Sequence, residues 1–460
     1  MQEIDVAIIG AGTAGITAQR AATKAGARAV MFDPGPLGTT CARVGCMPSK
    51  LLISAAEVAH SARVATEFGV RLGAIEIDGE AVMARVQQMR DEFVDSTISG
   101  LERVEAKGGL VRQAARLTSA NTLTAGGQHY KAGAIVVATG SRPWTPPPYR
   151  QLGDRLLSTD QIFELPTLPE SLLVVGAGAI GIELALAFAR LGVRVTVVEL
   201  EGKLAGVSDP NVRDSAYTIF SDELDLQTRH EFKSVLAENN QVRFQFVDDA
   251  GRARDERYEY VLVATGRRPN LEGLGLESLG LGAADDILAS VDSATAQVGT
   301  SSLFLAGDVT GTRTLLHEAA DEGSIAGENA ARYPDEPREV RRPTILGVVF
   351  SEPQIATVGL AYDALPGNAA IAEYDFAGQS RAKVLGRAKG CLRVYAAPDG
   401  TLLGATVFGP HAEYLGHLLA WLVDSGATAS EALAHSYYHP TVVEAIQSVL
   451  RKLLRGLKAG

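Results

Sequence analysis

A glycine-rich turn between an apolar strand and a helix occurs twice in this chain, and this repeat constrains the fold more than any other feature. The first copy follows the apolar residues 5–10, and the second follows residues 172–176. Such a Gly-x-Gly-x-x-Gly turn admits a pyrophosphate to the N-terminus of the helix that follows. The repeat predicts two dinucleotide-binding units with parallel sheets. Its glycines are Gly10, Gly12, Gly15, Gly176, Gly178 and Gly181.

Each unit continues into a second apolar strand that ends in an acid. Residues 28–33 end in Asp33 and residues 194–199 end in Glu199, and the interval from the first glycine to the acid is the same in both units. An acid at this position can bond the ribose hydroxyls of a dinucleotide. A lone glycine fingerprint is weak evidence, but here strand, helix and acid occur in register. We therefore expect two nucleotide sites.

Each unit also closes with a matching apolar strand and Ala-Thr-Gly turn, at residues 136–143 and 262–269. The stretch between glycine turn and closing strand is longer in the first unit. The additional residues include two cysteines and a charged helix expected around residues 86–105. The first unit has therefore been enlarged to carry chemistry.

Two of the three cysteines, Cys41 and Cys46, lie in a run that otherwise reads as a helix. In an ideal helix their Cα atoms would be about 8 to 9 Å apart, beyond the roughly 7 Å limit for a disulfide. Gly45 and Pro48 allow the bend that closure needs. Alternatively the cysteines are small buried residues or half of a zinc site, although no second half with zinc-like spacing exists. The two residues alone leave redox chemistry and burial open.

Composition narrows the function classes. A chain of 460 residues exceeds the usual size of a single core, so we expect three or four domains. A net charge of −11 and a pI near 5.3 argue against nucleic acid or an anionic membrane as partners. The first apolar strand follows Met1 too closely for a signal peptide, and no apolar run reaches spanning length. We expect a cytoplasmic protein, where a disulfide persists mainly when it is catalytic.

Asp308 ends a third apolar strand, residues 303–308, just before a helix that begins near His317. A carboxylate at this strand end can hold a polyol hydroxyl. The alternative interpretation is an aspartate that caps the following helix.

The pattern changes from about residue 343 onward. Strands are expected at residues 347–350, 392–395 and 403–407, followed by helices and without a glycine fingerprint, which predicts a separate α+β domain. Near its end His439 and Glu444 lie five positions apart across a proline. Such a pair can orient an imidazole for proton transfer, although a surface loop that enters a helix at Pro440 is the plainer interpretation.

Together these motifs resemble the class I pyridine nucleotide-disulfide oxidoreductases, typified by the dihydrolipoamide dehydrogenases and glutathione reductases. Cys-x4-Cys before Met-Pro-Ser-Lys, the two fingerprints, the two Ala-Thr-Gly turns, Ala-Gly-Asp and His-Pro-Thr-x-x-Glu occur in family order from end to end. The resemblance implies an α/β fold with two Rossmann-like domains that bind FAD and NAD, plus a C-terminal α+β dimerisation domain. It places these parts at residues 1–145 and 269–340 for FAD, 146–268 for NAD and 341–460 for the dimer interface.

The resemblance also implies the roles of particular residues. The FAD would lie along the first unit with its flavin beside Cys46, and the chain would form a homodimer whose sites each take His439 and Glu444 from the other subunit. No metal is expected. The implied catalytic residues are Cys41, Cys46, His439, Glu444, Lys50 and Glu183. The implied cofactor-binding residues are Gly10, Gly12, Gly15, Asp33, Thr40, Lys50, Thr139, Gly140, Asp308, His317, Ala319, Gly176, Gly178, Gly181, Glu199 and Gly266.

A few positions discriminate within the family. Glu199 would repel a 2′-phosphate where NADPH-dependent relatives carry arginine, so NAD is favoured over NADP. The segment 315–320 is similar to that of the dihydrolipoamide dehydrogenases. No cysteine follows Cys391, which argues against a mercuric reductase or a large thioredoxin reductase and leaves Cys391 a structural role. The chain departs from the family at Thr39, a glycine in relatives, at Ala42-Arg43, usually Leu-Asn, and at Tyr437, commonly histidine.

The resemblance therefore implies the activity of the dihydrolipoamide dehydrogenases. The protein would take electrons from a dihydrolipoyl group, on a lipoylated carrier protein or a 2-oxoacid dehydrogenase complex, through Cys41 and Cys46 to FAD and NAD⁺. Two alternatives stay open: an NADH-dependent reductase of another small or protein disulfide, and a docking flavoprotein whose redox site is idle.

Overall fold

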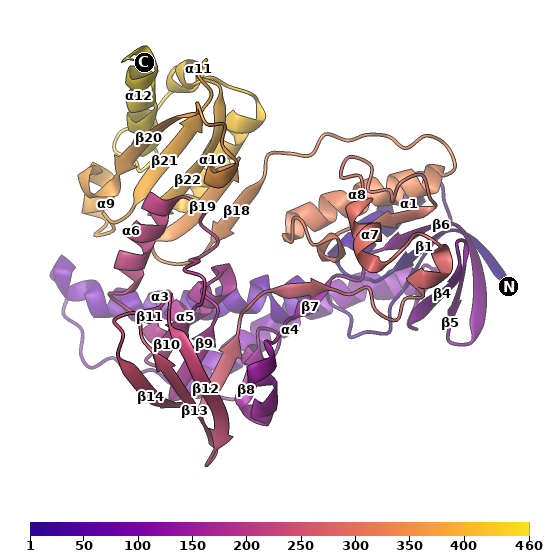
Figure 1. Cartoon of the computed structure of the whole chain (residues 1–460), viewed down its shortest axis with the longest axis horizontal. Helices are drawn as coiled ribbons and strands as arrows, with labels where there is room; N and C mark the ends of the chain where they lie inside the picture. Colours follow the sequence, from indigo (N-terminus) through magenta and orange to yellow (C-terminus); the bar gives the residue numbers. More distant parts are fainter. Residues whose placement is uncertain (460) are drawn as a thin grey trace. The chain divides into compact units, whose positions relative to one another are not determined.

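The computed structural model describes residues 1–459, whose helices and strands Figure 1 labels. The chain divides into two compact units. The first unit comprises Met1–Pro48, Arg85–Trp144 and Arg267–Arg342. The second comprises Ser49–Ala84, Thr145–Gly266 and the residues from Pro343 onward. The domain boundaries expected from the sequence stay a prediction, and residues Ser49–Ala84, which that prediction gave to the FAD-binding domain, cluster with the second unit. The finer division of the second unit into a nucleotide domain and a dimerisation domain stays a prediction.

The first unit is organised around one mixed sheet with the order β3-β2-β1-β6-β5-β4, and β17 pairs with the far side of β6. All pairings among five of these strands, β1, β2, β3, β6 and β17, are parallel, as a doubly wound dinucleotide fold requires. The strands span Gln2–Ile9 (β1), Ala29–Phe32 (β2), Leu110–Val111 (β3), Ala115–Ser119 (β4), Thr122–Ala125 (β5), Gln128–Val137 (β6) and Leu303–Leu305 (β17).

Both faces of this sheet are buried, which explains the uninterrupted apolar run in β1. Val6 and Ile8 pack on one face with Ala14 and Ala18 of a helix, whereas Ala7 and Ile9 pack on the other face. Successive residues of a strand point to opposite faces, so residues 6–9 of β1, which are covered on both sides, are all apolar.

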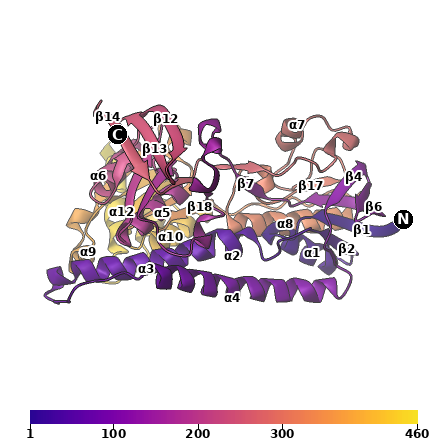
Figure 2. The same cartoon turned by 90° about the horizontal axis from the view of Figure 1, so that it is seen from below.

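Helices α1 (Thr13–Lys24) and α8 (Leu316–Arg332) lie side by side (Figure 2). A Cβ atom on Gly323 would lie 2.2 Å from the carbonyl oxygen of Ala14, and one on Gly327 would lie 2.2 Å from that of Ala18. Only glycine at these two positions of α8 permits such a close backbone approach. This contact holds the helix of the first glycine turn in place.

The second unit contains the second nucleotide sheet, a parallel sheet with the order β11-β10-β9-β15-β8, and a separate antiparallel sheet β12-β13-β14. Helices α5 (Ala179–Arg190) and α6 (Pro210–Phe220) belong to this part. The strands span Leu156–Ser158 (β8), Ser171–Val175 (β9), Arg194–Val198 (β10), Asp225–Gln227 (β11), Glu231–Glu238 (β12), Gln241–Val247 (β13), Ala253–Tyr258 (β14) and Tyr260–Val263 (β15).

The C-terminal part of this unit is an antiparallel sheet with the order β18-β19-β22-β21-β20. Its core includes Leu415 and Leu419 of one helix and Ile446 and Val449 of another, packed on the sheet. This confirms the α+β pattern expected after residue 343. The elements span Leu346–Val349 (β18), Gln354–Gly359 (β19), Ala370–Asp375 (β20), Ser380–Val384 (α9), Cys391–Ala396 (β21), Leu402–Gly409 (β22), Ala412–Asp424 (α10), Ala429–Leu433 (α11) and Glu444–Ala459 (α12).

Short segments complete the described chain. Strands β7 (Ser141–Pro143) and β16 (Arg267–Pro269) pair antiparallel within the first unit. Helix α7 spans Ala284–Ala289, and helices α2 (Thr40–Val44), α3 (Cys46–Val64) and α4 (Gly79–Glu105) carry the segment inserted into the first half. Within residues 1–459, no helix has the length and hydropathy needed to cross a membrane.

Candidate active site

Each of the three positions in the first turn is occupied by glycine for a different structural reason. Gly10 has φ +110°, and a Cβ atom there would lie 2.4 Å from the carbonyl oxygen of Ala138. A Cβ atom on Gly15 would lie 2.0 Å from the carbonyl oxygen of Gly10. Gly12 differs, because no protein atom lies within 4 Å of its Cβ position. The first and third glycines therefore permit strand–helix packing, and the second leaves open the space where a pyrophosphate would lie.

The second turn repeats this geometry. A Cβ atom on Gly176, whose φ is +104°, would lie 2.5 Å from the carbonyl oxygen of Ala264, and one on Gly181 would lie 2.0 Å from that of Gly176. Again the middle glycine, Gly178, faces open space within 4 Å. Because the same two contacts and the same opening recur, both turns fit a dinucleotide.

The two acids that follow are held by backbone amides. Asp33 accepts hydrogen bonds from Ala11 N at 2.7 Å and Gly35 N at 2.8 Å. A carboxylate offers about four lone-pair sites, so Asp33 keeps acceptor capacity for ribose hydroxyls. Its bond to Ala11 places it beside the glycine turn.

Glu199 is held in the same way in the second unit. One carboxylate oxygen accepts from Ala177 N at 3.2 Å, and the other accepts from Leu200 N and Glu201 N at 2.9 and 3.0 Å. The negative charge is therefore fixed beside the second glycine turn. A 2′-phosphate there would meet this charge at close range.

Asp308 lies close to the first glycine turn. It accepts a hydrogen bond from the Ser141 hydroxyl at 2.9 Å. The preceding Gly307 has φ +81°, and its Cβ position lies 2.9 Å from Cβ of Ala14 in the first turn of α1. Gly307, not Asp308, occupies the N-cap of the short 3₁₀ turn here. The capping interpretation of Asp308 is therefore wrong.

Of the other residues expected at the cofactor sites, Thr139, Gly140, His317 and Ala319 lie in the first unit, and Gly266 lies in the second. Thr139 donates a hydrogen bond to the carbonyl of Asn270 at 2.6 Å, and Asn270 N donates to the carbonyl of Gly140 at 2.9 Å. His317 is exposed at the start of α8, while Ala319 is buried beside Gly307. At the end of β15, Gly266 has φ +101° and open space around its Cβ position.

The cysteine segment is not one helix. Helix α2 ends at Val44, Gly45 has φ −123° and ψ −114°, and α3 begins at Cys46. A Cβ atom on Gly45 would lie 3.3 Å from Cα of Cys41, so glycine lets the chain turn back close to the first cysteine. Pro48 falls in the first turn of α3, where its missing amide is tolerated. The chain therefore bends at Gly45, between the two cysteines.

The departures from the family pattern have local structural roles. Thr39 has φ +63°, a conformation unfavourable for a β-branched residue, yet its hydroxyl accepts from Ala42 N at 3.3 Å and caps α2. Thr40, the first residue of α2, is exposed. Tyr437 donates a hydrogen bond to the carbonyl of Ala432 at 2.9 Å, which fixes the segment before His439.

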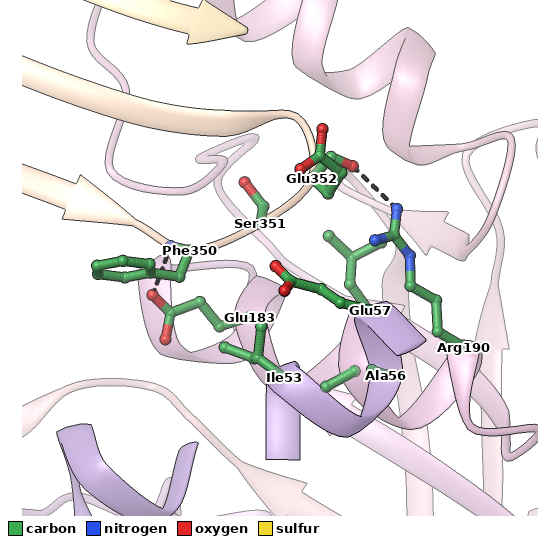
Figure 3. A pocket seen from close by; sticks show the side chains of 10 residues that line it. Ile53, Ala56, Glu57, Glu183, Arg190, Phe350, Ser351 and Glu352 are labelled. Atoms are coloured by element: carbon green, nitrogen blue, oxygen red, sulfur yellow. Dashed lines mark hydrogen bonds between the residues drawn. The ribbon is translucent and has the colours of Figure 1, made fainter. Parts of the chain in front are cut away.

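Lys50 and Glu183 form an ion pair within the second unit, with 2.8 Å between Nζ and Oε2. The Glu183 side chain is 6% exposed and that of Lys50 is 33% exposed. The other oxygen of Glu183 accepts from Phe350 N at 2.7 Å, as Figure 3 shows. Sequence reasoning missed Phe350, because its position at the end of an apolar strand carries no signal of this contact.

His439 and Glu444 also meet. Nδ1 of His439 lies 3.0 Å from Oε1 of Glu444, and Thr441 N donates to the second oxygen at 3.0 Å. These bonds, first that of His439 and then that of Thr441, lower the pKa of Glu444 below its usual range. The imidazole is 73% exposed. The pair therefore presents an oriented imidazole at the surface of the described chain.

Cys391 begins β21 and is buried. Burial, with a smaller contribution from Glu373, raises the pKa of its thiol to about 12. This thiol is therefore protonated at neutral pH and unsuited to thiolate chemistry. Among residues 1–459, no group of three or more His, Cys, Asp or Glu side chains is arranged to hold a metal ion.

Family models match nearly the whole chain. The pyridine nucleotide-disulphide oxidoreductase model matches residues 4–323, and the model of the dimerisation domain of these proteins matches residues 345–450. Members of this family bind FAD and NAD(P). The two glycine turns described above fit both groups.

Curated relatives cover almost the same length. The chain is 30% identical over 463 residues to a dihydrolipoyl dehydrogenase of Geobacillus stearothermophilus. The alignment covers 96% of this chain and 94% of that protein. It is 32% identical over 455 residues to a dihydrolipoyl dehydrogenase of Halobacterium salinarum, with coverage of 96% and 94%.

Solved structures share the fold. The HOCl-induced flavoprotein disulfide reductase RclA of Escherichia coli, as its Cu(II) complex, has a TM-score of 0.83 at 20% identity and covers 98% of this chain and 100% of its own. LpdA of Mycobacterium tuberculosis has a TM-score of 0.82 at 25% identity, with coverage of 98% and 100%. The first likeness concerns the fold alone. The chain belongs to the pyridine nucleotide-disulphide oxidoreductase family, as a flavoprotein disulfide oxidoreductase with a Cys41–Cys46 redox pair and a dimerisation domain.

Proposed function

We propose that this protein is a dihydrolipoamide dehydrogenase that uses NAD⁺. The observation that carries the proposal is the His439–Glu444 pair at 3.0 Å, since a dithiol substrate must lose a proton before it can attack a disulfide. Curated dihydrolipoyl dehydrogenases aligned over almost the full chain support the same choice of substrate. The dithiol would be a dihydrolipoyl group on a lipoylated carrier protein or on a 2-oxoacid dehydrogenase complex.

In the reaction we propose, His439 takes a proton from one substrate thiol. The resulting thiolate attacks Cys41 Sγ, a mixed disulfide forms, and Cys46 leaves as a thiolate. The second substrate thiol then attacks the substrate sulfur of the mixed disulfide, which closes the lipoyl disulfide. Its proton passes to Cys41, which leaves as a thiol, so that His439 holds the other proton and Cys46 remains a thiolate. Glu444 keeps the imidazole oriented, and general-base assistance of this kind contributes about 10² to 10⁴ in rate.

FAD would lie along the first glycine turn, where Asp33 and Asp308 would bind it and the open space at Gly12 would admit its pyrophosphate. Bound FAD would accept the two electrons of the reduced cysteine pair and deliver them to NAD⁺ as hydride. Lys50, held by Glu183, would place a positive charge beside the flavin, because Lys50 follows Cys46 by four residues in α3 and helix residues four apart share a face.

We further propose a homodimer in which His439 of one protomer serves the cysteine pair of the other. The dimerisation-domain match at residues 345–450, which includes His439 and Glu444, supports this arrangement. Mixing Cys41→Ser and His439→Gln protomers tests it. Hybrid dimers should regain activity, because one site then has an intact cysteine pair and an intact base. If the base acts within its own protomer, both sites of every hybrid are defective and activity stays absent.

The substrate assignment is tested by following nicotinamide absorbance with dihydrolipoamide and either NAD⁺ or NADP⁺. We expect turnover with NAD⁺ and little with NADP⁺, because Glu199 lies where the 2′-phosphate would bind. Equal rates would contradict the role of Glu199. Turnover of glutathione-type disulfides or thioredoxin with NADH, without turnover of lipoyl substrates, would favour a reductase of another disulfide. An isolated flavoprotein inactive with every disulfide would favour the docking role.

A further inference from the structure

Phe350 contacts both members of the Lys50–Glu183 ion pair. Its backbone N donates to Oε1 of Glu183 at 2.7 Å, and the centroid of its ring lies 4.5 Å from Nζ of Lys50. The three residues come from α5, from α3 and from the end of β18, all within the second unit. A residue that binds the anion through its backbone and the cation through its ring holds the pair in one geometry.

The contacts of Phe350 with Glu183 and Lys50 matter because of where the ion pair lies. The Glu183 side chain is almost fully buried, and its two oxygens accept from Lys50 and from Phe350 N. A lysine side chain is long and flexible, so a single bond to Glu183 would leave its ammonium mobile. An aromatic face attracts an ammonium ion and excludes water from one side of it. The ring therefore restricts where the Lys50 charge lies.

A small cavity beside Glu183 adds a second consequence. Phe350 and Glu183 line it together with Glu57, Arg190 and Glu352 (Figure 3). Its volume is about 10 Å³, about the space that one water molecule needs. Loss of the Phe350 ring would uncover one side of the Lys50 ammonium, which bonds to Glu183, and would admit water to the ion pair. Hydration would weaken the attraction between Glu183 and Lys50, because a higher local dielectric screens an ion pair.

We propose that Phe350 is a positioning residue that holds the Lys50 ammonium in place beside the flavin and thereby sets how strongly the reduced flavin and the Cys46 thiolate are stabilised. The inference rests on the proposed function in one respect, the position of the flavin beside Cys46. The inference identifies a contact between Phe350, which directly follows β18, and Lys50 of α3, the helix that begins at Cys46. The backbone bond of Phe350 is available to every residue type except proline, so the contribution of the ring can be isolated.

The experiment compares Phe350→Leu with Phe350→Tyr, which keeps an aromatic face. The readouts are the midpoint potential of bound FAD, measured by equilibration with a redox dye, and the thiolate–flavin charge-transfer absorbance of the two-electron-reduced enzyme. Phe350→Leu should lower the potential and weaken the charge-transfer band, because a mobile, hydrated ammonium stabilises the anionic reduced state less. Phe350→Tyr should keep both close to the wild type. Phe350→Met provides a second non-aromatic variant should the leucine variant fold poorly.

Phe376→Leu is the matched control, because Phe376 is a fully buried aromatic residue of the same unit that packs in the C-terminal core. It should lower stability without moving the potential. A flavin potential and charge-transfer band unchanged in both non-aromatic variants would overturn the inference, as would an equal shift in the Phe376 control. Both readouts are independent of lipoyl turnover, so an enzyme that ignores dihydrolipoamide but shows the shift would refute the substrate assignment while supporting the role of Phe350.

Discussion

Glu444 holds the exposed imidazole of His439 at 3.0 Å while its second oxygen is held by the amide of Thr441. Both bonds stabilise the carboxylate, which explains its lowered pKa. A depressed folded-state pKa means that the stability contributed by this carboxylate is present above its usual pKa and is lost as the pH falls through the lowered value. The imidazole therefore keeps its partner throughout the neutral range.

Replacement of the base should separate catalysis from cofactor binding. We expect His439→Gln to lower turnover by about 10² to 10⁴ and to retain bound FAD. Glu444→Gln should lower turnover less, since an amide oxygen can still accept from the ring without its charge. Steady-state rates with dihydrolipoamide and the flavin absorbance of the purified variants check both points. Wild-type turnover in His439→Gln would contradict the assignment.

Of two alanine substitutions in the first glycine turn, one should impair folding and the other should leave folding intact. Gly15→Ala places a Cβ atom 2.0 Å from a backbone oxygen and should impair folding of the first unit. Gly12→Ala meets no protein atom within 4 Å, so the chain should fold normally but lose FAD, because the methyl group occupies the cofactor space. Circular dichroism and flavin content distinguish the two. A Gly12→Ala protein with full FAD would refute this position of the pyrophosphate.

The equivalent substitution in the second turn should affect only the nicotinamide nucleotide. Gly178→Ala meets no protein atom within 4 Å, so we expect a folded protein with normal FAD content and weakened NAD⁺ binding. Dihydrolipoamide should still reduce its flavin in a stopped-flow experiment, whereas NADH formation should fail. Loss of FAD in this variant would show that the two turns do not hold the cofactors we assign to them.

A buried ion cluster in the first unit should contribute strongly to stability. Arg342, with 7% of its side chain exposed, bonds to Glu318 and lies 3.0 Å from Glu322, and the two carboxylates are 3% and 7% exposed. Arg342→Met should lower the free energy of unfolding by about 3 to 5 kcal/mol, because buried Glu322 loses its cation and buried Glu318 keeps only Arg313. Urea denaturation measures the change. The exposed pair Arg116–Glu277 is the control, and Arg116→Met should cost less than about 1 kcal/mol.

Thiol labelling should distinguish the third cysteine from the redox pair. The pKa of Cys391, raised by burial from its ordinary 9.0 to about 12, leaves almost no thiolate at neutral pH. A raised thiol pKa does not change stability below pH 9 and lowers it above that pH, since only the unfolded chain then ionises readily. After reduction of the folded enzyme, we expect iodoacetamide to modify Cys41 or Cys46 and to spare Cys391, as peptide mass spectrometry can show. Rapid labelling of Cys391 would contradict its burial.

Local spacing in the sequence was sufficient to predict the two nucleotide turns and the C-terminal α+β sheet. A glycine fingerprint, the strand before it and the acid after it lie within one supersecondary unit, so their geometry depends on neighbouring residues. The strand β1, the helix α8 with His317 near its start and the approach of His439 to Glu444 follow from short intervals in the same way. The order of these motifs along the chain was also enough to suggest the family.

Contacts between distant segments required the tertiary structure. The sequence left Asp308 between a cap and a polyol ligand, and the structure decides against the cap, because Gly307 occupies the N-cap and Asp308 accepts a hydrogen bond from Ser141. It treated the cysteine run as a distorted helix, whereas the chain forms two helices separated at Gly45. The clamp of Phe350 on Lys50 and Glu183 joins residues up to 300 positions apart. Side-chain packing between remote segments carries no periodicity along the chain, so only the folded structure reveals it.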